Sequence, residues 1–326
     1  MDLLEVSGIS RKLQQNTVVN DISFSQRRSQ KLAIAGETGS GKSTLLKMIA
    51  GLEQPDAGQI LFKGQKVLGP LFQLIPGHPG IAYLSQHYEL RNNYRVEEWL
   101  DMANRLPQSD ADALFRICRI DHLISRRTDQ LSGGEKQRIA LCRLLIGTPE
   151  LLLLDEPFSN LDPIHKQILK QVLDDIGNRL QISCILTSHD PQDTLSWADE
   201  LLVMRGGQLV QKGSPQQLYY HPQNEYVAGL LGSYLLLPEA VLSLFTTNRS
   251  QPLIHGKYLV RPEQFRIVPE QAGAVKAVIQ QLRFWGAFSE ILATVAGTTI
   301  VIKTMDPDPL SVGDTIYLQL AHATPS

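Results

Sequence analysis

The sequence predicts an α/β core with a helical subdomain, followed by a small all-β domain. Two observations indicate the core: apolar runs alternate with segments of helical periodicity up to about residue 213, and a glycine-rich loop joins one apolar run to its helix. A third indicates the second domain, because helical periodicity fades near Gly232 and short strands punctuated by Gly or Pro begin. The chain has 326 residues, which is enough for two domains, and we place them at residues 1–232 and 233–326.

The elements of the core follow the order expected for parallel strands joined by helices. Residues 31–36, KLAIAG, read as a short strand, and in residues 42–52 apolar side chains recur at helical spacing. Residues from about 90 to 143 are mostly helical, which predicts a helical subdomain at about 88–148. Two apolar runs, ELLLLDEP at 150–157 and SCILTSHD at 183–190, are typical of buried parallel strands. This alternation predicts a parallel sheet with crossover helices.

The C-terminal residues 233–326 have the pattern of a small barrel or sandwich. The segments KYLVRP, TTIVIKT and DTIYLQL are short and strand-like. In the last of them Ile316, Leu318 and Leu320 share one face, as in a strand that is buried on one side only. We therefore expect a separate β domain after residue 232.

Composition excludes several classes of protein. The formal net charge of −2 gives no global nucleic-acid signature. The opening residues MDLLEVSGIS do not read as a secretory signal, and the most apolar stretch, residues 227–245, contains Pro238 and Glu239 and does not read as a membrane span. The cysteines, Cys118, Cys142 and Cys184, form no pair motif, which favours a reduced cytoplasmic setting.

A phosphate-binding loop lies between the first core strand and its helix. Gly36, Gly41, Lys42 and Ser43 match the spacing G-x-x-x-x-G-K-S in the required strand–helix context. The glycines allow backbone N–H groups to surround phosphates, Lys42 would reach the β- and γ-phosphates, and the Ser43 hydroxyl would bind Mg²⁺. The predicted nucleotide-binding residues here are Gly36, Glu37, Thr38, Gly39, Ser40, Gly41, Lys42, Ser43 and Thr44.

Polar residues follow three of the other predicted strands. Asp155 and Glu156 end a buried apolar run, where two acids are costly unless a cation or a reaction uses them. The carboxyl edge of an open α/β sheet is where ligands bind, so we expect Asp155 to hold Mg²⁺ and Glu156 to polarise the attacking water. His189 could donate to a γ-phosphate. The alternatives are a turn cap for Glu156, a structural role for His189, and an ordinary strand-end position for Gln86.

A second anion-binding element begins at LSGG, residues 131–134. It starts an amphipathic helix, and a helix N-terminus offers free N–H groups and a positive dipole. Because it follows the helical insertion, it should lie far from the phosphate loop of the same chain. One solution is that it serves the nucleotide of a second copy, in a closed twofold dimer.

Together these motifs closely resemble those of the ATPase subunits of ABC transporters, which are P-loop NTPases. In the family's terms they are Walker A (36–44), the Q-loop residue Gln86, the signature (131–137), Walker B (151–156), the D-loop (159–162) and the switch histidine His189. The resemblance implies ATP as nucleotide, catalysis by Lys42, Glu156 and His189, and Mg²⁺ held by Ser43, Gln86 and Asp155. It also implies coupling through Gln86 and Asp162, and contact with the partner's ATP by Ser132, Gly133, Gly134 and Gln137.

The C-terminal pattern resembles the OB-like TOBE domain of importer ATPases. The resemblance implies a homodimer, integral membrane permease subunits, a solute-binding protein and a peripheral position on the cytoplasmic side of the membrane, with no nucleic acid. An exporter ATPase and a soluble, non-transport ABC ATPase are the alternatives. The chain departs from the family where an aromatic usually stacks on adenine: Leu13 aligns there, and no aromatic occurs between Ser7 and Ser23. The helical insertion is also short.

Overall fold

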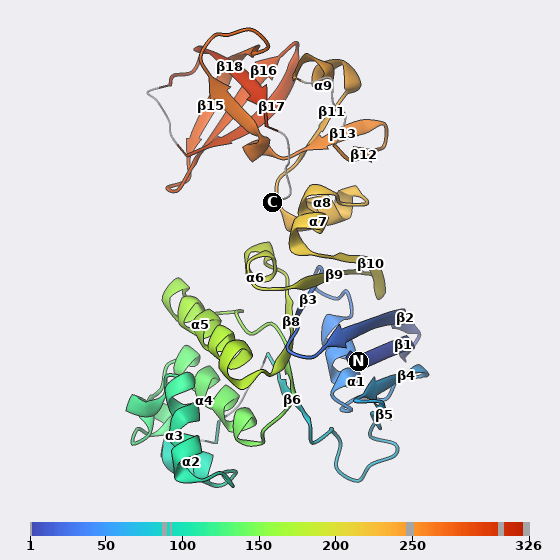
Figure 1. Ribbon diagram of the computed structural model, residues 1–326, viewed down its shortest axis with the longest axis vertical. Helices are drawn as coiled ribbons and strands as arrows, with labels where there is room; N and C mark the ends of the chain where they lie inside the picture. Colours follow the sequence, from blue (N-terminus) through green and yellow to red (C-terminus); the bar gives the residue numbers. More distant parts are fainter. Residues whose placement is uncertain (1, 87–89, 92, 246–250, 306–309, 322–326) are drawn as a thin grey trace. The chain divides into compact units, whose positions relative to one another are not determined.

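The computed structural model describes residues 2–86, 90–91, 93–245, 251–305 and 310–321. It divides into two compact units, Met1–Pro215 and Gln216–Ser326 (Figure 1). The predicted start of the helical subdomain, near residue 88, and the end of the predicted tail, residues 322–326, lie outside the described residues.

A six-stranded sheet forms the centre of the first unit, in the order β10-β9-β3-β8-β7-β6. All neighbours in it pair in parallel except β10 with β9, which are antiparallel. Every residue of β7 and β8 is buried, which explains why these strands read as continuous apolar runs. The predicted parallel α/β core is confirmed. The strands are β3 (Lys31–Ala35), β6 (Ile81–Leu84), β7 (Leu151–Leu154), β8 (Ser183–Ser188), β9 (Glu200–Arg205) and β10 (Gln208–Gly213).

An antiparallel sheet, ordered β2-β1-β4-β5, packs beside the central one. Its strands are β1 (Asp2–Leu13), β2 (Asn16–Arg27), β4 (Ala57–Phe62) and β5 (Gln65–Lys66). Helix α1 (Lys42–Ile49) buries Leu45, Leu46 and Ile49 in one apolar cluster with side chains from both sheets. This shared core fixes the phosphate loop, which joins β3 to α1.

Most of the remaining helices of the first unit lie together on one side of it, and α6 (Pro191–Leu195) lies apart from that group (Figure 1). Helix α4 carries the LSGG motif at its start and ends at Gly147. Helix α5 begins after its N-cap, Asp162, and has proline at its first turn. The helices are α2 (Val96–Asp101), α3 (Gln108–Ile117), α4 (Gly133–Ile146), α5 (Pro163–Leu180) and α6 (Pro191–Leu195).

The second unit is built mainly of strands. A five-stranded sheet, β14-β18-β15-β16-β17, and a three-stranded sheet, β11-β13-β12, account for most of it. Ile316, Leu318 and Leu320 of β18 are buried, as their alternation predicted. The elements are α7 (Pro215–Tyr220), α8 (Glu225–Leu231), β11 (Leu235–Leu237), α9 (Glu239–Phe245), β12 (Leu253–Ile254), β13 (Lys257–Val260), β14 (Phe265–Val268), β15 (Val275–Phe284), β16 (Ser289–Val295), β17 (Thr298–Thr304) and β18 (Thr315–Leu320).

The second unit begins before residue 233 because a buried arginine joins α7 and α8 to it. The Arg261 guanidinium donates to the carbonyl oxygens of Tyr219, Ala228, Gly232 and Ser233, at 2.8–3.1 Å. The guanidinium also lies 4.1 Å from the centre of the Tyr219 ring. Residues that look like the end of an α/β domain in the sequence therefore fold with the β strands.

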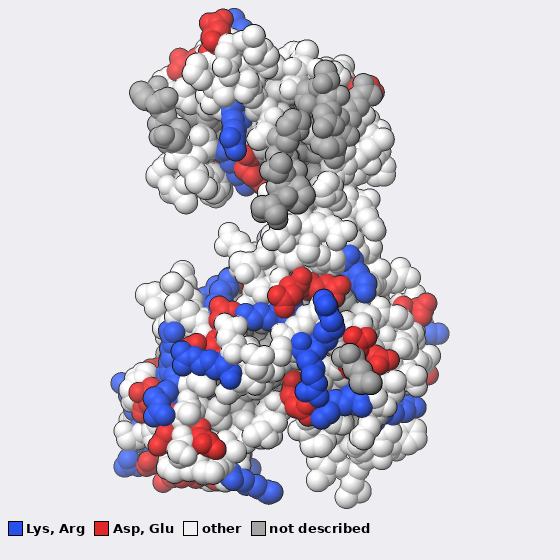
Figure 2. Space-filling view, viewed as in Figure 1, with Lys and Arg blue, Asp and Glu red and all other residues white. Residues whose placement is uncertain are grey.

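Surface charges of both signs are mixed. On the face in Figure 2, Lys and Arg side chains are interspersed with Asp and Glu. Neighbouring charges of opposite sign form ion pairs, such as that between Lys63 Nζ and Glu150 Oε1 at 2.8 Å. None of the helices in the described residues is both long enough and apolar enough to cross a bilayer.

Candidate active site

The structure brings four sequence-predicted loops to one edge of the central sheet. Strands β3, β6, β7 and β8 pair in parallel, so their carboxyl ends lie along the same edge. The phosphate loop, Gln86, the Asp155–Glu156 pair and His189 follow these strands in turn. A cavity of about 420 Å³ at this edge is lined by residues that include Thr38, Gln86, Glu156, Ser159 and His189.

The phosphate loop closes around the ammonium group of Lys42. Nζ donates to the carbonyl oxygens of Gly36 at 2.8 Å and Glu37 at 2.9 Å, and the residue is 4% exposed. Burial lowers the pKa of Lys42, against the opposing effect of nearby carboxylates. Gly41 has a φ of 98°, and a Cβ there would lie 2.3 Å from the Val18 carbonyl oxygen, so only glycine fits. The Lys42 ammonium group therefore already lies inside the phosphate loop.

The Asp155 carboxylate accepts hydrogen bonds from three hydroxyl groups. Ser43 and Thr187 donate to Oδ1, and Tyr83 donates to Oδ2, each at 2.9 Å. Burial and the negative charge of Asp155 raise the pKa of Tyr83. Asp155 is 4% exposed, so these bonds fix its orientation. Tyr83 and Thr187 could not be recognised from the sequence, because a tyrosine and a threonine in apolar strands have no distinctive spacing.

These oxygen atoms fit Mg²⁺, which prefers carboxylate, hydroxyl, water and phosphate oxygens. The Ser43 hydroxyl already points to the Asp155 carboxylate, and Gln86 lines the adjoining cavity. In the part of the chain that is described, no cluster of three or more His, Cys, Asp or Glu side chains could hold a metal ion without help. A divalent ion held here by Ser43 and Asp155 would complete its coordination with oxygens from water or from a bound phosphate.

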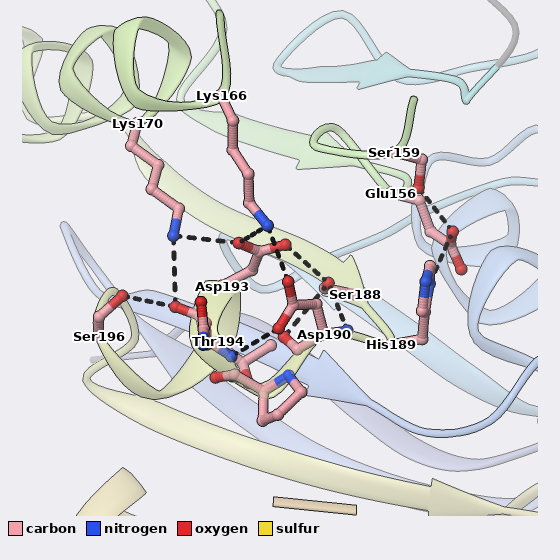
Figure 3. A network of polar contacts seen from close by, with 12 residues as sticks. Glu156, Ser159, Lys166, Lys170, Ser188, His189, Asp190, Asp193, Thr194 and Ser196 are labelled. Carbon is pink, nitrogen blue, oxygen red and sulfur yellow. Dashed lines mark hydrogen bonds and ion pairs between the residues drawn. The ribbon is translucent and has the colours of Figure 1, made fainter. Parts of the chain in front are cut away.

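Glu156 and His189 meet at the cavity (Figure 3). Glu156 Oε2 accepts a hydrogen bond from Ser159 Oγ at 2.8 Å and lies 3.2 Å from His189 Nδ1. The Glu156 N–H donates to Thr187 Oγ1 at 2.9 Å, and the residue has a φ of 46°. The turn after β7 thus directs Glu156 and Asp155 to different partners.

The start of α4 has the geometry of a helix cap. Ser132 is the N-cap, and its N–H donates to Glu135 Oε2 at 2.8 Å while its Oγ accepts from the Glu135 N–H at 3.3 Å. A Cβ at Gly133 would meet nothing within 4 Å, whereas one at Gly134 would lie 2.6 Å from the His165 ring. None of these residues lines the cavity that holds Glu156 and His189.

Three other predicted residues also lie away from this cavity. Gln137 is 3% exposed, and its Nε2 donates to the carbonyl oxygen of Pro157 at 2.5 Å. Asp162 caps α5, where its Oδ1 accepts the N–H groups of Ile164 and His165 at 3.0 Å. Leu13 ends β1 and is 42% exposed.

Comparison with known proteins identifies the family. The family described as "ABC transporter" matches residues 19–159, and the "TOBE domain" family matches residues 258–324. The Fe(3+) ions import ATP-binding protein FbpC of Serratia marcescens is 33% identical over 339 residues, covering 98% of this chain and 97% of the relative. FbpC 2 of Haemophilus influenzae is 31% identical over 338 residues, covering 98% and 95%. The chain belongs to the ABC transporter ATP-binding proteins.

Solved structures agree with this ABC ATPase fold. CbiO1 of Clostridium perfringens, described as part of the ABC transporter complex cbiONQ, has a TM-score of 0.59 and 25% identity, covering 67% of this chain and 90% of that one. An ATP-binding cassette in its ADP conformation has a TM-score of 0.60 at 21% identity, which shows the fold alone. The predicted resemblance, fold class and ATPase activity are confirmed. This chain is an importer-type ABC ATPase with a C-terminal TOBE domain.

Proposed function

We propose that two copies of this ABC ATPase hydrolyse two Mg·ATP and drive membrane permease subunits that import a solute captured by a solute-binding protein. The enzyme would lie peripherally on the cytoplasmic side of the membrane. The observation that carries this proposal is the set of four strand-end loops around one cavity, in a chain that is related over nearly its full length to import ATP-binding proteins.

Each predicted group at this edge has a geometry suited to one part of phosphoryl transfer. Lys42 would exchange its two carbonyl acceptors for phosphate oxygens and neutralise their charge. Glu156 Oε2 would accept a proton from the attacking water, and His189 would donate to the γ-phosphate. Ser43 and Asp155 would hold Mg²⁺, whose chemistry here is to neutralise charge on the β- and γ-phosphates. Catalysis would then be mainly positioning and charge stabilisation.

A second copy would complete the site. Ser132 and Gly133 lie at the start of a 14-residue helix, and neither lines the chain's own cavity. The open space around Gly133 would let a partner's γ-phosphate approach backbone N–H groups. ATP would favour the closed dimer because it binds that state better than the open one.

Replacing Glu156 by glutamine tests the catalytic proposal. The variant should bind ATP and dimerise, while its turnover falls by about 10²–10⁴-fold, the range for loss of general base catalysis. Glu150→Gln is the control, because Glu150 is a partly exposed carboxylate at the other end of β7, paired with Lys63 and Arg28. Wild-type turnover in Glu156→Gln would remove Glu156 from the catalytic role.

The relatives suggest ferric ion as the solute, since their names describe Fe(3+) import. Affinity capture of the tagged protein from detergent-solubilised membranes, followed by mass spectrometry, tests the partners. A multi-span permease with a solute-binding protein supports import, and binding of ferric ion to that protein then tests the solute. A permease alone points to export, and ribosomal proteins or DNA instead of a permease would overturn a transport role.

A further inference from the structure

We propose that Lys166 and Lys170 of α5, with Asp193 of α6, form a positioning network that holds the loop carrying His189 against Glu156 (Figure 3). The inference rests on the proposed function, because it takes Glu156 and His189 to be the groups that act on water and phosphate. The three network residues do not bind nucleotide in this proposal. They act through the position of His189.

The centre of the network is a buried carboxylate between two ammonium groups. Asp193 is 2% exposed, and its Oδ1 lies 2.8 Å from Lys166 Nζ and 3.0 Å from Lys170 Nζ. The lysines are four residues apart on α5, so they project from the same face of the helix. A buried carboxylate is costly unless it is paired, so this arrangement strongly favours one placement of α6 against α5.

The same network holds both neighbours of His189. Lys166 Nζ lies 2.8 Å from Asp190 Oδ2. Ser188 Oγ donates to Asp193 Oδ2 at 3.3 Å and accepts the Asp190 N–H at 3.0 Å. Residues 188 and 190 are therefore tied to α5, whereas the His189 side chain is 57% exposed and points to Glu156 Oε2. The restraint on the histidine comes from its loop.

The charges in the network support one another. Burial lowers the pKa of Lys166, but the hydrogen bonds to Asp190 and Asp193, together with the negative charges of these two carboxylates, raise it by more, so that the net shift is upward. Burial raises the pKa of Asp190, but the hydrogen bonds from Lys166 and from the Gln192 N–H, together with the positive charges of Lys166 and Lys170, outweigh this, so that the net shift is downward. Both groups therefore stay charged at neutral pH.

Helix α5 also connects this network to the segment after Glu156. Lys170 Nζ lies 5.4 Å from the centre of the Phe158 ring and 3.3 Å from the Gln192 carbonyl oxygen. Asp162, to which the family resemblance assigns a coupling role, is the N-cap of the same helix. A displacement of α5 during dimer closure would therefore move the His189 loop with it.

Lys166→Met in the full-length ATPase tests the proposal. We expect kcat to fall by about 10–100-fold, because small misplacements of catalytic groups have effects of this size. We expect KM for ATP and ATP-driven dimerisation to change less than about twofold, and Lys166→Arg to recover much of kcat because it keeps the charge. The control is Arg179→Met, on the same helix, whose ion pair with Asp175 is largely exposed on the arginine side. Unchanged kcat in Lys166→Met, or an equal loss in Arg179→Met, would overturn the network.

A double-mutant cycle distinguishes positioning from general stability. If Lys166 acts through His189, Lys166→Met should have little further effect on kcat in a His189→Ala background. Full multiplication of the two losses would refute action through the histidine. If Lys166→Met does not fold, Lys170→Met, which keeps the Lys166 bridge to Asp193, is judged by the same criteria. Glu156→Gln is measured in parallel. If Glu156→Gln loses turnover but Lys166→Met keeps wild-type kcat, the network alone is rejected. If Glu156→Gln keeps wild-type turnover, the proposed function is rejected.

Discussion

Replacing Arg261 by leucine should loosen the start of the second unit by about 3 kcal/mol. The guanidinium is fully buried and donates to four carbonyl groups. Leaving an enclosed acceptor without a donor costs about 1–3 kcal/mol. We count the carbonyls of Tyr219, which accepts two N–H groups, and of buried Ala228, which gives about 2–6 kcal/mol. Part of this loss of stability is offset, because the variant no longer buries a charged guanidinium. The cost of that burial is seen in the lowered pKa of Arg261.

Hydrogen exchange of the full-length protein measures this loss where it should occur. A loss of about 3 kcal/mol in local stability accelerates amide exchange by about 10²-fold. The amides of α8 and β13 should therefore exchange about 10²-fold faster in Arg261→Leu than in the wild type. Arg283→Leu is the control, because Arg283 is half exposed and its ion pair with Glu290 should contribute less than about 1 kcal/mol. Acceleration of less than about fivefold in Arg261→Leu, or the same acceleration in the control, would refute the reasoning.

Four further substitutions test the first unit. Gly134→Ala should lower the free energy of unfolding by about 1–3 kcal/mol because its Cβ meets the His165 ring, whereas Gly133→Ala should be neutral or stabilising by up to about 1 kcal/mol; urea unfolding that fails to separate the two would contradict the packing. Tyr83→Phe removes one of the three hydroxyl donors to the Walker B carboxylate, so it should cost about 1.5–3 kcal/mol in urea unfolding and raise the Mg²⁺ concentration needed for half-maximal ATPase activity. Leu13→Tyr should increase ATP affinity by fivefold or more, since base stacking contributes about 1–3 kcal/mol. Unchanged ATP affinity would mean that residue 13 does not face the base.

The residues at the sheet edge could be predicted because a simple rule of topology places them. Polar residues that end parallel strands of one sheet lie along the same edge of that sheet, whatever the details of packing. Asp155, Glu156 and His189 each follow an apolar run, and the glycine loop before Lys42 follows another. The structure brings Glu156 and His189 into contact with each other. It holds Asp155 against the phosphate-loop helix through a hydrogen bond from Ser43.

The residues that support this edge could not be predicted, because their roles depend on register and on helix placement. Tyr83 reaches Asp155 only because β6 pairs with β7 in one register, Tyr83 opposite Leu153. Lys166 and Lys170 look like ordinary solvent-facing lysines of an amphipathic helix, and a single buried aspartate gives them another role. The start of the second unit depends on Arg261, whose partners lie about thirty to forty residues earlier in the chain.

Residues of the signature motif have different environments at the start of α4 and one turn later. Ser132 caps α4, and Gly133 at its first turn faces open space. Gln137, four residues further along, is buried and donates to the Pro157 carbonyl oxygen, next to the proposed catalytic glutamate in the sequence. Both parts of the motif carry the same name, but the serine and glycine at the start of α4 would meet a second copy in the proposed dimer, whereas Gln137 fixes the helix to the segment after β7. The geometry therefore favours contact between the motif's serine and glycine and a partner's nucleotide, with Gln137 acting as the anchor that sets where the helix start lies relative to Glu156.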